Sequence, residues 1–276
     1  MNPRDRSQPK GRLTSALTTS CGLIALSRGG SGRPVLLLHD LASSRESFDP
    51  LIESLGAELQ LVQIDLLGHG ASDLRPTDLS ISAQSEAVAE VIADLGFQQA
   101  TIVGHSLGGS VAIHLAAYHP ELVGKLVLIS AGSYEYRFPL RWRLCRSRLG
   151  WRLLGLLGGP GAVERALRLS GATSGTLSRA NDPLESRAGW SALGRAFRQS
   201  TSEAALSELE HLAESSIVHP TLVVWGTANR LLPVASARVF FQRRLNIRFV
   251  EVTDAGHAVH EVAPNVVADL IREFLG

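Results

Sequence analysis

The chain has 276 residues, 45% of them hydrophobic, and a formal net charge of +1 at pH 7. This length suits one large domain or two small ones with a substantial core, and the near-zero charge argues against a nucleic-acid partner. The two cysteines, Cys21 and Cys145, provide no disulfide framework, and we expect both to be reduced.

Residues 1–19 are predicted to form a disordered basic tail. Their start, MNPRDRSQPKGRLTS, is polar and basic and lacks the apolar segment of a secretory signal. The chain contains no uninterrupted apolar stretch long enough to span a bilayer. We therefore expect a cytoplasmic protein.

From residue 20 onward, apolar runs alternate with helical patterns, which predicts an α/β fold with a mainly parallel sheet and helices on both faces. Continuously apolar runs such as Val35–Leu38 are typical of strands that are covered on both faces. The predicted strands are Gly22–Ser27, Pro34–Leu38, Leu59–Ile64, Gln99–Val103, Lys125–Ile129, Pro220–Trp225 and Ile247–Val252. The predicted helices are Glu46–Leu55, Ser82–Leu95, Ser106–His119, Val234–Arg244 and Pro264–Leu275.

The alternation stops between residues 133 and 219, where helical periodicity continues without a clear strand. We interpret this insertion as a helical cap over the carboxyl ends of the strands, where open α/β sheets bind ligands. The sheet domain then comprises residues 20–132 and 220–276.

The predicted cap carries a basic stripe. Arg137, Arg141, Arg148 and Arg152 have the spacing of one stripe on a helix that begins near Pro139. Such a helix can contact an anionic membrane surface weakly or receive an acidic substrate. The alternative is an ordinary cap helix with its arginines in water and its apolar side on the pocket. That side would carry Phe138, Trp142, Leu149 and Leu153.

The most informative motif is Gly104–Gly108, with the sequence GHSLG. It follows an apolar strand pattern and opens a helical one, which is the context of a nucleophile elbow. A serine on such a strained turn exposes its Oγ, and the flanking glycines let the strand and the helix pack closely. The N-terminus of the helix adds free N–H groups where an oxyanion would form.

Taken in order, five motifs give the chain a resemblance to the α/β-hydrolase fold family over roughly residues 20–276. They look like the strand entering the oxyanion loop, the D-x-x-G-x-G-x-S turn, the nucleophile elbow, the acid strand with its loop, and the histidine loop. In this sequence they are Val35–Asp40, Asp65–Ser72, Gly104–Gly108, Pro220–Pro233 and Asp254–His257.

The resemblance implies that Ser106 is the nucleophile, that His257 is its base, and that the N–H groups of Leu41 and Leu107 form the oxyanion hole. Asp40 departs from the family pattern, because it stands where the family usually has glycine. Its negative charge would oppose an oxyanion, so we expect the side chain to point away from the hole.

The position that the resemblance gives to the catalytic acid holds Asn229. Asparagine cannot stabilise an imidazolium, and the same change in a serine protease costs about 10⁴ in rate. Three explanations stay open. In the first, Glu135, after the predicted strand Lys125–Ile129, serves as the acid. In the second, the site binds ligands without efficient turnover. In the third, the protein is a slow hydrolase with a Ser-His-Asn set, or the asparagine is an engineered replacement.

The sequence therefore predicts a cofactor-independent serine hydrolase with an acyl-enzyme at Ser106. The substrate would be a small ester, thioester or lactone with an apolar acyl part. The alternative is a ligand-binding or sensor protein on the same fold with an impaired triad. No metal motif and no nucleotide-binding glycine spacing is present in the sequence.

Overall fold

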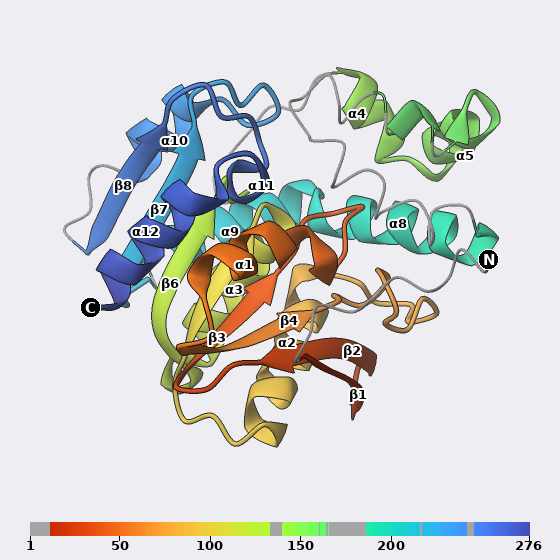
Figure 1. Cartoon of the computed structure of the whole chain (residues 1–276). Helices are drawn as coiled ribbons and strands as arrows, with labels where there is room; N and C mark the ends of the chain where they lie inside the picture. The colour runs from red at the N-terminus through yellow and green to blue at the C-terminus, as the bar shows by residue number, and fades with distance from the viewer. Residues whose placement is uncertain are drawn as a thin grey trace, which may run out of the picture.

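The computed structural model describes residues 12–132, 140–159, 161–163, 165, 186–215, 217–241 and 246–276. An eight-stranded sheet forms its centre (Figure 1), with the strand order β1-β2-β4-β3-β5-β6-β7-β8. The strands are β1 (Leu13–Thr19), β2 (Gly22–Gly29), β3 (Arg33–Leu38), β4 (Leu59–Ile64), β5 (Ala100–His105), β6 (Val123–Ile129), β7 (Thr221–Gly226) and β8 (Ile247–Val252). The β1–β2 and β2–β4 pairs are antiparallel, and the remaining pairs are parallel.

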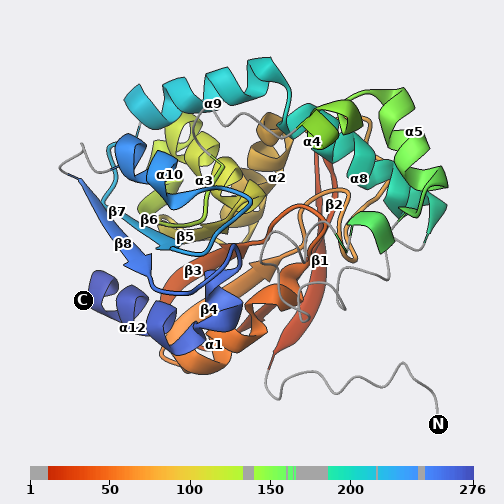
Figure 2. The same ribbon diagram turned by 90° about the horizontal axis from the view of Figure 1, so that it is seen from above.

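Helices cover both faces of the sheet (Figure 2): α2, α3, α9 and α10 lie on one face, and α1 and α12 on the other. The helices are α1 (Asp49–Leu55), α2 (Ile81–Asp94), α3 (Leu107–Tyr118), α4 (Leu140–Cys145), α5 (Arg148–Leu156), α8 (Arg187–Ser200), α9 (Glu203–Ser215), α10 (Val234–Phe241), α11 (Val259–Val262) and α12 (Pro264–Leu275). Two 3₁₀ turns are η1 (Arg45–Phe48) and η2 (Pro120–Leu122). The predicted α/β class, with a mainly parallel sheet and helices on both faces, is confirmed.

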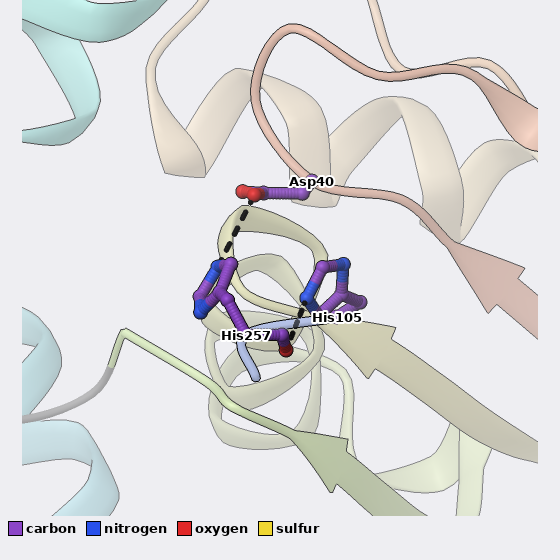
Figure 3. Close-up of side chains that lie close together, drawn as sticks. All are labelled: Asp40, His105 and His257. Atoms are coloured by element: carbon purple, nitrogen blue, oxygen red, sulfur yellow. Dashed lines mark hydrogen bonds and ion pairs between the residues drawn. The ribbon is translucent and has the colours of Figure 1, made fainter. Parts of the chain in front are cut away.

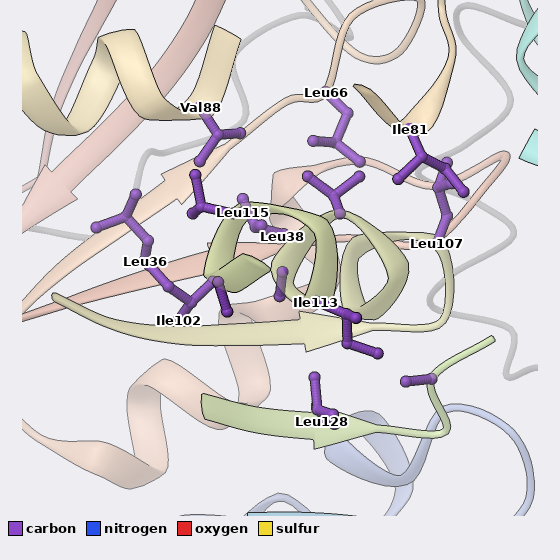
Figure 4. Close-up of a cluster of buried hydrophobic side chains, with 14 of the residues drawn as sticks. Leu36, Leu38, Leu66, Ile81, Val88, Ile102, Leu107, Ile113, Leu115 and Leu128 are labelled. Atoms are coloured by element: carbon purple, nitrogen blue, oxygen red, sulfur yellow. The ribbon is translucent and has the colours of Figure 1, made fainter. Parts of the chain in front are cut away.

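The alternation of side chains along β3 fills the core on both sides of the sheet. Leu36 and Leu38 belong to the cluster under α2 and α3 (Figure 4). Val35 and Leu37 point the other way, into the cluster under α1 and α12. Because successive side chains of a strand point to opposite faces, a continuously apolar run is needed where helices cover both.

The predicted disordered tail is wrong from Leu13 onward. Residues Leu13–Thr19 form β1, which pairs in full antiparallel register with β2. The strand lies at the edge of the sheet and is mostly exposed, so its side chains are not apolar enough to be recognised from hydrophobicity. Residues 1–11 of the predicted tail lie outside the described residues.

The insertion between β6 and β7 is helical in its described residues, which contain α4, α5, α8 and α9. In Figure 1, α4 and α5 lie beyond the ends toward which the strands point. The single basic helix predicted across Arg137–Arg152 is wrong. The chain breaks between α4 and α5, where the hydroxyl of Ser147 accepts a hydrogen bond from the N–H of Gly150 and caps α5.

The first turn of α3 is pressed against the carboxyl end of β3. The Gly108 N–H donates to the carbonyl of His39 at 3.1 Å. A Cβ added at Gly108 would lie 2.0 Å from the backbone oxygen of Leu38, and one at Gly104 would lie 2.4 Å from that of Gly108. The glycines of the GHSLG motif are therefore required by packing between backbones.

Gly108→Ala should destabilise the protein by about 1–3 kcal/mol or prevent folding, because the methyl group meets backbone that cannot move aside. Gly124→Ala is the matched control, since its Cβ would find its nearest neighbour at 3.6 Å, an ordinary contact. Urea unfolding of both variants measures the difference. Equal stabilities would show that the approach of α3 to β3 is not the constraint described here.

Candidate active site

Ser106 lies at the turn between β5 and α3 in a conformation that few residues other than glycine adopt. Its φ and ψ are 50° and −108°. The Ser106 N–H donates to the carbonyl of Ile129 at 3.0 Å, and its carbonyl accepts from the N–H of Ser110. These bonds hold the strained backbone from both sides. Ser106 consequently lines a cavity and is partly accessible.

The carboxylate of Asp40 occupies the predicted oxyanion hole. Its Oδ1 accepts from the N–H of Leu41 at 2.6 Å and from the N–H of Leu107 at 3.3 Å. The expectation that this side chain points away is wrong. Asp40 directly follows β3, and its own loop brings it over the first turn of α3. Two converging N–H groups then attract the nearest anion.

The second oxygen of Asp40 faces the predicted base. Its Oδ2 lies 3.3 Å from Nε2 of His257 (Figure 3). Both side chains are buried, and His257 is the ion-pair partner of Asp40 in the part of the chain that the structure describes. One carboxylate therefore gathers two backbone donors and one side-chain donor.

Asn229 contacts the opposite side of the imidazole, at the position predicted for the catalytic acid. Its Oδ1 accepts from the N–H groups of Leu231 and Leu232, at 3.1 and 3.0 Å. These two bonds fix the orientation of the amide, so its NH₂ group is the one that faces His257 Nδ1 at 3.1 Å and the hydroxyl of Ser130 at 3.2 Å.

This orientation determines the tautomer of His257. Because Asn229 Nδ2 donates to it, Nδ1 of the ring must be an acceptor without a proton. The proton of the neutral ring is then on Nε2, from which it is donated to Asp40 Oδ2. A base that accepts the serine proton needs a lone pair on Nε2. The resting site thus holds His257 in the tautomer opposite to that of a working triad.

The pKa of Asp40 lies well below its ordinary value. Burial by itself would raise this pKa, and the hydrogen bond from His257 is the largest of the effects that lower it. The carboxylate is therefore ionised at neutral pH. Burial is the main cause that lowers the pKa of His105, to about 3, so His105 is neutral.

His39 fixes the backbone of the Asp40 loop. Its ring Nδ1 donates to the Asp40 carbonyl at 2.7 Å, and its Nε2 accepts from the Leu66 N–H at 3.0 Å. Burial lowers the pKa of His39 to about 4, which keeps the ring neutral and the acceptor available. His39 thereby ties the oxyanion loop to the turn that begins at Asp65.

The Asp65–Ser72 turn is closed by its own polar groups. Asp65 accepts from the N–H groups of Arg45 and Ala71 and forms an ion pair with the Arg45 guanidinium. The Ser72 hydroxyl donates to the Asp65 carbonyl and accepts from the N–H of Ala25 in β2. These contacts give the motif a structural role that is separate from the chemistry at Ser106.

The cavity above Ser106 has apolar walls. They come from the oxyanion loop, from α3, from the loop after Asn229 and from the cap; the apolar lining residues include Leu41, Leu107, Trp151, Val163, Leu193, Phe197 and Leu232. The lining hydroxyls of Ser200, Thr201 and Ser110 donate to main-chain carbonyls at 2.6–2.7 Å. Their donor protons are used within the protein, so the walls favour an apolar ligand.

The cap helix α5 shows one side to the cavity and another to solvent. Trp151 is buried, stacks on Trp190 and lines the cavity. Leu149 and Leu153 are exposed beside Arg148 and Arg152, so the expectation that these two leucines face the pocket is wrong. Arg137 and the Arg141 side chain lie outside the described residues, and a membrane-surface contact stays a prediction.

Of the predicted site residues, Ser106, His257, Asn229, Leu41 and Leu107 come together around Asp40. Glu135, the alternative acid, lies outside the described residues. Asp254 has a left-handed backbone and an exposed side chain, and its N–H donates to Thr227 Oγ1; it belongs to the turn before His257.

Asp40, His105 and His257 each offer one metal-ligating atom within 4.8 Å of the others. However, hydrogen bonds within the group already use Nε2 of both histidines: His105 Nε2 bonds the carbonyl of His257, and His257 Nε2 bonds Asp40 (Figure 3). We therefore treat the three residues as a hydrogen-bonded cluster.

Among the described residues, no helix is long and apolar enough to cross a membrane.

Comparisons with known proteins agree with this architecture. Residues 33–264 match the family model of the alpha/beta hydrolase fold. The chain belongs to the α/β-hydrolase fold family. It is 27% identical over 255 residues to 2-(acetamidomethylene)succinate hydrolase of Mesorhizobium japonicum, with 89% of each chain covered. It is 29% identical over 262 residues to an uncharacterized protein of Mycobacterium tuberculosis, covering 89% of this chain and 76% of that protein.

Among solved structures, a thermophilic esterase from Thermogutta terrifontis superposes with a TM-score of 0.78 at 22% identity, covering 95% of this chain and 98% of the esterase. At this identity the likeness shows the fold alone. The relatives of this α/β-hydrolase therefore include hydrolases, while the arrangement of Asp40, His257 and Asn229 comes from its own structure.

The tautomer of His257 can be observed directly. In ¹⁵N NMR of the histidine-labelled protein at neutral pH, we expect Nε2 of His257 to carry the proton and Nδ1 to be unprotonated. In Asn229→Asp both nitrogens should be protonated, because a carboxylate would then face each of them. Asp254→Asn is the matched control and should keep the wild-type pattern. A protonated Nδ1 with a free Nε2 in the wild type would contradict the assignment.

Proposed function

We propose that this α/β-hydrolase is a cofactor-independent serine hydrolase. It acts on a neutral ester, thioester or lactone with an apolar acyl part, through an acyl-enzyme at Ser106. The observation that carries the proposal is the strained Ser106, which lines an apolar cavity. Backbone strain costs free energy, and strained residues cluster at active sites, where the strain helps to present a catalytic side chain.

In the proposed reaction, Ser106 Oγ attacks the carbonyl carbon, and the serine proton passes to Nε2 of His257. The carbonyl oxygen becomes an oxyanion that accepts from the N–H groups of Leu41 and Leu107. Collapse of this intermediate breaks the bond to the alcohol or thiol, which leaves with the proton from His257. Water then attacks the acyl-enzyme by the same route and releases the acid.

Two groups must change before this chemistry begins. Asp40 has to leave the two N–H groups that the oxyanion needs, and Nε2 of His257 has to present a lone pair. Asn229 opposes the second change, because a proton on Nδ1 would face its NH₂ group. We therefore expect a slow enzyme, with a loss of about 10⁴ in rate on the scale of a triad that lacks its acid.

A ligand-binding or sensor protein on the same fold is the second candidate. It is favoured by the occupied oxyanion hole and by the Asn229 contact, which together leave the resting Ser106 without an available base. In such a protein the cavity would bind an apolar, neutral ligand, and no covalent step would follow.

A fluorophosphonate probe separates these functions, because its fluoride is displaced only by an activated serine. Intact-mass measurement should show one slow phosphonylation in the wild type and none in Ser106→Ala. Slow turnover of a short-chain aryl ester should disappear in the same variant. Ser110→Ala, which changes the next serine along the cavity wall, is the matched control. The absence of Ser106-dependent labelling over hours would exclude the hydrolase and leave the ligand-binding protein.

A further inference from the structure

The hydrogen bonds of Asp40 are those of a bound carboxylic acid product. One of its oxygens accepts from both N–H groups of the oxyanion hole, those of Leu41 and Leu107. The other faces Nε2 of His257. A carboxylate released by hydrolysis would present its two oxygens to these same three donors, because it is formed between Ser106 and the hole.

Among the described residues, the Asp40 carboxylate forms no ion pair with a lysine or arginine. The group beside it is His257, which accepts at Nδ1 from Asn229 and carries its proton on Nε2. The other cavity walls are apolar, with their hydroxyl protons directed to main-chain carbonyls. A second anion entering the cavity would therefore meet an ionised carboxylate at close range.

We propose that Asp40 is a specificity-determining residue: its carboxylate occupies the place of the acid product, so that the site accepts neutral carbonyl compounds and rejects carboxylates. A neutral carbonyl can displace Asp40 from the two N–H groups, while the carboxylate keeps its contact with His257. An anionic ligand would force two carboxylates together. This inference rests on the proposed function for its chemistry, but its first test requires no turnover.

The repulsion between two unit charges about 4 Å apart corresponds to about a fivefold to a thousandfold loss of affinity, depending on the local dielectric. A neutral and an anionic ligand of the same shape should therefore differ measurably. Butyramide and butyrate are such a pair, and their short chains suit an apolar wall. Their affinity ratio is insensitive to a general weakening of the cavity, because both ligands would be affected alike.

Binding of the two ligands by NMR titration tests the proposal. Wild-type protein should bind butyramide more tightly than butyrate, and Asp40→Gly should shift the ratio toward butyrate by about tenfold or more. Asp40→Asn, which keeps the side-chain volume, should shift the ratio in the same direction and serves if the glycine variant does not fold. Asp254→Asn removes a nearby exposed carboxylate as the matched control and should leave the ratio unchanged. An unchanged ratio in both Asp40 variants would overturn the proposal.

Labelling rates provide a second test through a double-mutant cycle. Asp40→Gly frees the two hole donors and should accelerate fluorophosphonate labelling by up to about 10²-fold. Asn229→Asp alone should stay within a few-fold of the wild type, because two carboxylates would then hold His257 as an imidazolium. The double variant has a free hole and a correctly oriented base, and it should exceed the wild type by about 10⁴-fold.

The results distinguish the two proposals. Rapid wild-type labelling that Asp40→Gly does not increase would leave the hydrolase in place and overturn the role given to Asp40. An Asn229→Asp variant as fast as the double variant would also overturn that role. Labelling in the double variant alone, together with the expected shift in the butyrate ratio, would support the role of Asp40 and favour the ligand-binding function for the natural chain.

Discussion

The close approach of α3 to the end of β3 is the constraint on which the site depends. Gly108 allows the two backbones to meet and donates to the carbonyl of His39. This contact places the N–H of Leu107 beside the loop that follows β3, where the N–H of Leu41 faces the same point. Two parallel donors in a buried position need an acceptor, and the next residue after His39 provides one.

Asp40 and Asn229 both depart from the family pattern, and together they move the carboxylate from one side of the His257 ring to the other. The family resemblance places a carboxylate on the Nδ1 side of the histidine and glycine in the oxyanion loop. Here Asn229 stands on the Nδ1 side and Asp40 in the loop. The imidazole therefore still has one carboxylate and one neutral neighbour, but the carboxylate faces Nε2. Moving the negative charge across the ring reverses the preferred tautomer and fills the hole in the same step.

Most of the sheet could be predicted from sequence because a buried parallel strand has to be apolar on both faces. The strands Leu59–Ile64 and Ile247–Val252 and the helix Pro264–Leu275 have the predicted bounds. The edge strand β1 could not be predicted in this way, since an exposed edge has no need of apolar side chains. The break before α5 depends on the local cap at Ser147, which competes with the periodicity of the arginines.

The residues that form the site could be predicted from the sequence more fully than the orientation of their polar groups. Glycine spacing is sufficient to locate Ser106, because the packing at Gly104 and Gly108 excludes other residues. The orientation of Asp40 depends instead on two main-chain N–H groups that come from segments 66 residues apart, and a sequence does not show where such groups converge. The amide orientation of Asn229 likewise depends on the N–H groups of Leu231 and Leu232, which any residues could have supplied.

The same hydrogen bonds limit what the cavity can bind. An ionised carboxylate among apolar walls is stable only while several donors surround it, and Asp40 obtains two of its three donors from the oxyanion hole. A ligand that takes those two N–H groups leaves Asp40 with His257 alone. The contacts of the ligand must offset the loss of these two hydrogen bonds, and the contacts that the cavity offers are mainly apolar. Affinity should therefore grow with the apolar part of the ligand, while its polar part stays a single neutral acceptor.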